Sequence, residues 1–233
     1  MMNNPFGSTP AQAGVRPSVD LTQRFLVHAF AWMFAGLLLT AGVAAVVQSS
    51  PTLTSFAQKN FLLLFFGQLA IVFAISGLIR RMSATLALGL FFVYAATLGL
   101  TVGLIVQAYT QTSVVTAFLS ASAMFGGAAL YGATTKRSLA SLGGFFVMGL
   151  IGLLVAVVVN LFLQSSGLSL LISVAGVILF TALTAFDVQR IQNGTLAIAV
   201  GSVEKAAVIG ALQLYLDFIN LFLFLLRLTG SRR

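Results

Sequence analysis

The chain alternates between long, almost purely apolar runs and short polar connections. Each run holds about the 20 residues that an α-helix needs to cross the hydrocarbon core of a bilayer. This pattern predicts an all-α integral membrane protein, a seven-helix bundle in which residues 21–233 form a single transmembrane domain. The runs span about residues 25–47, 61–79, 84–106, 112–131, 142–163, 168–192 and 206–228.

Residues 1–20, ahead of the first run, have a different character. They contain three of the four prolines, with Asn, Ser, Thr and Gly between them. Such a composition buries too little apolar surface to order itself, so a disordered polar tail is predicted. The first apolar run is too long for the core of a signal peptide and is expected to remain as a helix.

Composition supports the membrane assignment and narrows the function classes. The chain is 59% hydrophobic and only 7% charged, whereas about 25% of the residues in a soluble domain are charged. It has no cysteine and one histidine, His28, which leaves no disulfide framework and no histidine cluster for zinc or haem. Without a phosphate-binding glycine loop, a nucleophile elbow or an HExxH motif, we expect neither an enzyme nor a cofactor.

The basic residues lie between the apolar runs rather than in one patch. The net charge is +8, but Arg80–Arg81, Lys136–Arg137 and the segment Arg190–Lys205 mark every second connection. This is the distribution of the positive-inside rule, and it argues against nucleic-acid binding. It predicts a multi-pass protein with a cytoplasmic N-terminus.

The last run fits this topology poorly. It begins near Lys205, on the predicted inner side, yet it is followed by Arg232 and Arg233, which also favour that side. Either the run spans with a weak topology signal or it is re-entrant and surrounded by protein. Close helix contacts are expected where glycines gather, at Gly99 and Gly103, at Gly126–Gly127, and along the fifth run.

Two of the four acidic residues, Asp187 and Asp217, lie inside apolar runs. A charge there costs about 2.5 kcal/mol or more, so such residues usually face a cavity or a partner. We expect these two carboxyl groups to form a pair, the aspartate pair, since two carboxylates at low dielectric cannot both stay ionised. Such a pair is both a pH sensor and a transient cation site.

Each aspartate belongs to a polar stripe on its own helix. Gln213, Asp217 and Asn220 share one face of the last helix, and Thr184 precedes Asp187 on the sixth. From the inner side, Asp217 lies about 16 Å deep and Asp187 about 10 Å, which tilt can reconcile. Two alternatives stay open: Asp217 as a structural hydrogen-bonding carboxyl, and Asp187 as a helix-end residue paired with Arg190.

Arg80 and Arg81 end the second run on the same inner side. A guanidinium there could move onto ionised Asp187 and latch the site, because desolvated arginine–carboxylate pairs are strong. The alternative is a topology signal whose side chain reaches the membrane surface.

Three segments carry a family resemblance: YGATTKRSLASLGGFFVMGLIGLLVAVVVNLFL, TALTAFDVQRIQ and ALQLYLDFINLFLFLLRLTG. They resemble the bacterial branch of the Bax inhibitor-1 family. The resemblance implies six helices in two triple-helix layers around a central C-terminal helix. It also implies a pH-sensitive calcium leak gated by a hydrogen-bonded aspartate pair, which the motifs carry onto Asp187 in TAFD and Asp217 in LYLD. The implied arginine latch falls on Arg80, with Arg81 adjacent.

The resemblance places the protein in the bacterial inner membrane, in contact with the lipid bilayer, calcium and protons. It further implies that bacterial relatives associate with a membrane-bound AAA protease. Two alternatives to the channel therefore stay open. One is a non-conducting regulator that binds such a partner through residues 1–20, and the other is a proton-coupled transporter.

Overall fold

The computed structural model describes the chain from residue 19, and its side chains from residue 25, to Arg233. The predicted tail lies outside the described residues except for its last two, which begin the first helix. Every regular element described is helical, apart from one isolated antiparallel bridge between Tyr109 and Arg232. The elements are α1 (Val19–Ser49), α2 (Pro51–Lys59), α3 (Phe61–Leu78), α4 (Ala84–Gln107), α5 (Gln111–Thr134), η1 (Ala140–Leu142), α6 (Gly143–Leu163), α7 (Ser166–Gln192), α8 (Thr195–Val200) and α9 (Val203–Thr229).

Seven of these helices are long and apolar enough to cross a membrane: α1, α3, α4, α5, α6 (with η1), α7 and α9. They coincide with the seven predicted runs, so the all-α membrane fold is confirmed. Several begin at a hydroxyl side chain that accepts a hydrogen bond from a first-turn backbone amide, as Ser83 does for α4 and Ser202 for α9. These caps satisfy amides that the helix itself leaves unpaired.

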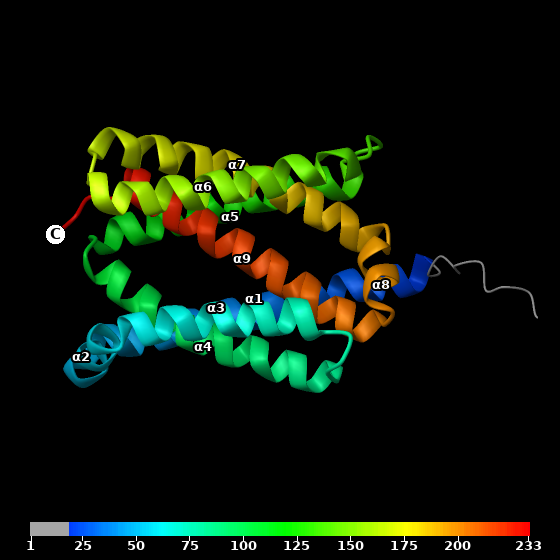
Figure 1. Ribbon diagram of the computed structural model, residues 1–233, viewed down its shortest axis with the longest axis horizontal. Helices are drawn as coiled ribbons and strands as arrows, with labels where there is room; N and C mark the ends of the chain where they lie inside the picture. The colour runs from blue at the N-terminus through cyan, green and yellow to red at the C-terminus, as the bar shows by residue number, and fades with distance from the viewer. Residues whose placement is uncertain (1–18) are drawn as a thin grey trace, which may run out of the picture.

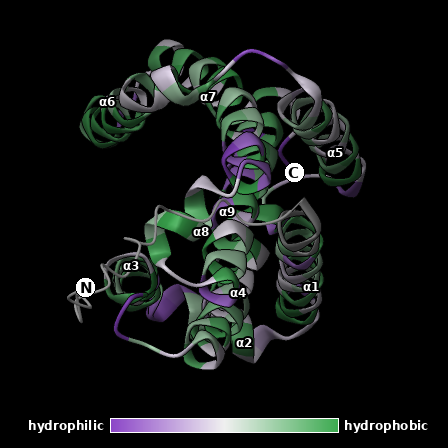
Figure 2. Cartoon of the chain, turned by 90° about the vertical axis from the view of Figure 1, so that its right-hand side faces the viewer, coloured by the Kyte–Doolittle hydropathy of each residue, from purple (hydrophilic) through white to green (hydrophobic). Residues whose placement is uncertain are grey.

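Helix α9 lies at the centre of the bundle. It packs against α1 and α4 on one side and against α5 and α7 on the other, while α3 packs on α4 and α6 packs on α7. Viewed from the end that carries α8, α9 separates a group of α1, α3 and α4 from a group of α5, α6 and α7 (Figure 2). The finer prediction of two regular triple-helix layers goes beyond these contacts and stays a prediction.

Burial distinguishes the central helix from the outer ones. Of the apolar window in α9, 72% is buried inside the protein, against 11% in α3 and in α6. Helix α9 is continuous for 27 residues and runs along the bundle from the α8 end toward the end where the chain finishes (Figure 1). The last run is therefore a full-length helix of the bundle, and the re-entrant alternative is wrong.

The predicted glycine contacts are only partly present. A Cβ added to Gly99 or Gly103 would lie 2.7 or 2.8 Å from the Cβ of Val43 or Val47, so these glycines allow α4 to approach α1 closely. Gly126 and Gly127, by contrast, have open space where a Cβ would stand. The prediction is wrong for that pair, because it lies on a part of α5 that faces away from the other helices.

Candidate functional site

Asp217 lies near the middle of α9, and its side chain is enclosed by the protein. The residue is 4% exposed, and its Oδ2 has no hydrogen-bond partner within the described residues. One turn earlier on the same face, Gln213 Oε1 is also buried without a partner. Asn220, the third member of the stripe, donates its side-chain amide to the Leu216 carbonyl of its own helix, at 2.8 Å. Two acceptor oxygens therefore remain unsatisfied in the membrane span.

Asp187 lies one to two turns before the end of α7 and is 6% exposed. Its Oδ1 is 3.5 Å from Nη1 of Arg190, one helical turn further on. The Arg190 guanidinium also lies over the Phe186 ring, 5.3 Å from its centroid. The structure thus contains the helix-end pair that the sequence left open as an alternative for Asp187.

The two carboxyl groups of the aspartate pair lie on α7 and α9, two helices that pack against each other. They are close enough to interact electrostatically. Because Asp217 Oδ2 has no hydrogen-bond partner, no hydrogen bond joins the pair through that oxygen. Thr184 is fully buried beside them and donates its hydroxyl hydrogen to the Phe180 carbonyl, at 2.8 Å. The arrangement therefore leaves a buried acid with an acidic neighbour and an unused acceptor.

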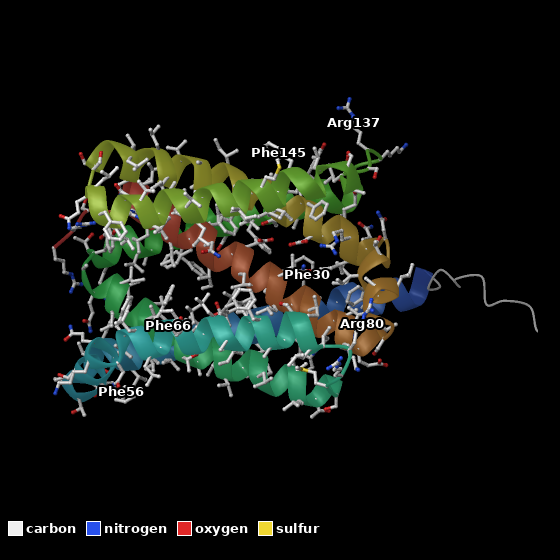
Figure 3. All side chains as sticks on the ribbon, viewed as in Figure 1. Phe30, Phe56, Phe66, Arg80, Arg137 and Phe145 are labelled. Carbon is white, nitrogen blue, oxygen red and sulfur yellow. The ribbon has the colours of Figure 1, made fainter. Side chains whose placement is uncertain are left out.

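Arg80 and Arg81 follow α3 at the end of the bundle where α8 lies, and Figure 3 labels Arg80 there. Arg80 Nη2 donates to the Ala199 carbonyl of α8, at 2.5 Å, and the Arg80 carbonyl accepts from Lys205 Nζ, at 3.2 Å. The Arg80 side chain is therefore bound to α8 and not to Asp187. Its role as a latch on the aspartate stays a prediction.

Helix α8 is not predicted by the sequence, which indicates only a basic connection over residues 190–205. Its core residues Leu196 and Ala197 are buried, and it packs on both α7 and α9. It starts after Gly194 and ends at Gly201, both with positive φ, at 67° and 78°. These two glycines around an apolar TLAIAV segment were the signal, since glycine adopts this conformation without a Cβ penalty.

The opposite face of α9 carries a polar cluster that the sequence did not indicate. Tyr215 is fully buried, and its hydroxyl lies 2.5 Å from Thr40 Oγ1 of α1. Thr40 donates its only hydroxyl hydrogen to the Ala95 carbonyl of α4, at 2.8 Å, so Tyr215 is the donor to Thr40. The Tyr215 ring packs edge-on against Phe91 and Tyr94. This cluster ties α9 to α1 and α4.

The chain closes the far end of the bundle with its last residues. The Thr110 amide donates to the Ser231 carbonyl and the Arg233 amide to the Ala108 carbonyl, each at 3.1 Å. The Arg232 guanidinium lies over the Tyr109 ring, 5.9 Å from its centroid. The connection between α4 and α5 is thereby fixed to the end of α9.

The aspartate pair has few of the ligands that a resident metal would need. Within the described residues, no three His, Cys, Asp or Glu side chains come together. Calcium takes about six to eight oxygen ligands, so two carboxylates and the Gln213 oxygen would have to be supplemented by water.

Comparison with known proteins identifies the family. The model of the family described as "Inhibitor of apoptosis-promoting Bax1" matches residues 22–233. The chain belongs to the Bax inhibitor-1 family. It is 41% identical to the inner membrane protein YbhL of Escherichia coli, over 94% of this chain and 96% of YbhL. It is also 44% identical to a protein of Deinococcus radiodurans, over 92% of this chain and 94% of that protein.

The family match covers all seven membrane-spanning helices, including α7 and α9 with the aspartate pair. The resemblance noted in the sequence is thus confirmed at the level of the family. The protein is a multi-pass membrane protein of the Bax inhibitor-1 family, and the roles of its individual site residues stay predictions.

Proposed function

We propose that the protein is a pH-sensitive cation leak channel, with calcium as the permeant ion and the aspartate pair as its gate. The observation that carries the proposal is Asp217 Oδ2, a buried carboxyl oxygen without a partner inside a membrane span and next to a second acid. Intramembrane acids are costly and usually serve ion or proton pathways. An amide would fill the same space without titrating.

The gate works through the charge on the pair. When both carboxyl groups are ionised they repel each other, and a shared proton removes that repulsion and can join them by a hydrogen bond. Asp187 has a second option, because Arg190 is already in contact with it. The protonation state therefore selects between the contact across α7 and α9 and the contact within α7, and a change of contact moves α9.

Helix α8 provides the second element of the gate. It packs on the ends of both aspartate-bearing helices and is held by Arg80 through the Ala199 carbonyl. Opening the path on this side requires α8 to move, which releases the Arg80 guanidinium. Free Arg80, or Arg81 beside it, then serves as the latch on Asp187 that the sequence predicted.

The positions of the basic residues indicate how the protein is oriented in the membrane. Arg80 and Arg137 lie at the α8 end of the bundle (Figure 3). Arg190 in the last turn of α7 and Lys205 in the first turn of α9 flank α8 along the chain. By the positive-inside rule this end is cytoplasmic, in the inner membrane of a bacterium. The proposed channel is not an enzyme and needs no cofactor.

The test uses purified protein in liposomes that enclose a calcium-sensitive dye, with calcium leak measured across a pH series. The wild type should leak in a pH-dependent manner, and Asp187→Asn/Asp217→Asn should lose that dependence. Glu204→Gln is the matched control, because it neutralises an acid on α9 that is not buried in the bundle. It should keep the wild-type profile.

If the double variant showed the same pH profile of calcium leak as the wild type, the proposal would be contradicted. That result would favour the alternative, a non-conducting regulator of a membrane-bound protease. Under that alternative the aspartates are structural and the partner binds residues 1–20. Deleting residues 2–20 would then abolish effects on the protease. Under the channel proposal, the same deletion leaves the leak intact.

A further inference from the structure

A small polar pocket lies at the α8 end of the bundle, between the connection of α5 to α6 and the end of α7. Its volume is about 230 Å³. Its walls are mainly polar, and they include two basic residues and no acidic one: Thr135, Lys136, Arg137, Ser138, Gln189, Gln192 and Asn193, together with Gly132 and Ala133. A pocket of this composition favours an anion.

Gln189 holds the basic wall of this pocket in place. It is 7% exposed, and its Nε2 donates to the Arg137 carbonyl at 2.8 Å while its Oε1 accepts from the Leu139 amide at 2.7 Å. Gly132 on the neighbouring helix touches the Ala185 carbonyl so closely that a Cβ has no room. The connection that carries Lys136 and Arg137 is therefore anchored to α7 at two points rather than free in solvent.

The positive charge of this pocket is not neutralised by the protein. Within the described residues, the ion pair between Arg190 and Asp187 is the one that forms, and neither Lys136 nor Arg137 contacts a carboxylate. In Figure 3, Arg137 projects beyond the helices at the end of the bundle. This is the level at which the bilayer surface would lie, since α5, α6 and α7 all end or begin there.

An apolar groove begins directly below the same connection. One part, of about 570 Å³, is lined by residues of α5, η1, α6 and α7, and a second part, of about 470 Å³, continues between α6 and α7. The two parts share Phe146, Ile178 and Ala182 as walls. Ser138 lines the polar pocket and the next residue, Leu139, lines the groove. The groove faces the hydrocarbon region, because α6 has little contact with any helix other than α7.

From this juxtaposition we infer that the protein binds one anionic phospholipid at this site. The phosphate lies against Lys136 and Arg137, and an acyl chain follows the groove between α6 and α7. Basic pockets at the cytoplasmic ends of membrane helices attract anionic headgroups, and an apolar groove in continuity with the pocket suits a ligand that carries its own chain. The inference does not depend on the proposed leak, since it uses none of the gate residues.

The headgroup arm of the test measures lipid binding by native mass spectrometry on delipidated protein in detergent. The probes are phosphatidylglycerol and the zwitterionic phosphatidylcholine. The wild type should retain one phosphatidylglycerol in preference to phosphatidylcholine. Lys136→Gln/Arg137→Gln should lose about thirtyfold in affinity for the anionic lipid. Lys59→Gln/Arg233→Gln removes the same net charge from exposed positions at the other end, and it should bind like the wild type.

The groove arm leaves the charge unchanged. Gly152 lines the groove and has open space around a new Cβ, so Gly152→Leu places a side chain in the groove. It should weaken binding of the long-chain lipid several-fold. Gly127→Leu, at an exposed glycine that also has open space and lines none of the three cavities, should not. Melting temperatures of all variants report whether each is folded.

Three results would overturn the inference. The first is an equal preference for phosphatidylglycerol in Lys136→Gln/Arg137→Gln and the wild type. The second is an equal loss in Lys59→Gln/Arg233→Gln, which would mean that net charge alone governs binding. The third is displacement of the lipid by inorganic phosphate at equal concentration, since that outcome assigns the pocket to a free anion and leaves the groove without a role.

Discussion

The two faces of α9 carry polar groups in opposite conditions. Toward α1 and α4, Tyr215 and Thr40 form a closed set, in which each hydroxyl hydrogen has an acceptor and the ring is fully packed. Toward α7, Asp217 and Gln213 each keep a buried oxygen without a partner. A satisfied buried network fixes a helix, whereas an unsatisfied one is costly and changes with protonation. One face therefore anchors α9, and the other is free to respond to protonation.

The stability of the protein should depend most strongly on the anchored face. Tyr215→Ala removes a fully buried aromatic side chain and should lower the free energy of unfolding by about 3–5 kcal/mol. Thermal unfolding in detergent, followed by fluorescence, measures the change. Tyr215→Phe keeps the ring and should recover most of the loss. If Tyr215→Ala melts like the wild type, the anchor does not exist.

Thr40→Val should have the next largest effect. It removes the acceptor of the Tyr215 hydroxyl and leaves that hydroxyl buried and unpaired, at a cost of about 1–3 kcal/mol. Thr181→Val is the matched control, because the Thr181 hydroxyl bonds only to the Val177 carbonyl of its own helix. Equal melting temperatures for the two variants would contradict the proposed anchor.

On the responsive face, Asp217→Asn should change stability by only about 1 kcal/mol or less, since the two side chains have nearly the same shape and Oδ2 has no hydrogen bond to lose. The melting temperature of the wild type should nevertheless vary with pH more than that of the variant. Identical pH dependence in both would show that Asp217 does not titrate in the folded protein.

Arg190→Gln should have the smallest effect on stability, about 1 kcal/mol or less, because the Arg190 side chain is partly exposed and buried Asp187 can take up a proton when the guanidinium is gone. Its expected effect is on function, since it removes the cation that competes for Asp187. The pH profile of calcium leak should therefore shift, with its amplitude kept. An unchanged profile would separate Arg190 from the gate.

The membrane-spanning helices and both aspartates were predictable, because apolar runs of membrane length and isolated intramembrane acids are local features of the sequence. The polar cluster on the anchored face was not predictable. Tyr215 and Thr40 are 175 residues apart, and no local pattern distinguishes a tyrosine that finds a hydroxyl across the bundle from one that simply packs. The hydrogen bond from Arg80 to the Ala199 carbonyl could not be predicted either. It depends on α8, whose six residues are too few for their periodicity to indicate a helix.

If protonation of the aspartate pair gates the leak, the protonation state of the pair and the leak must change over the same pH range. Infrared difference spectra of the protein in liposomes can follow the carboxyl band of a buried acid across the same pH series as calcium leak. The carboxyl band and the leak should change together, and both changes should vanish in Asp187→Asn/Asp217→Asn. A leak that varies with pH while no buried carboxyl band changes would contradict gating by the pair.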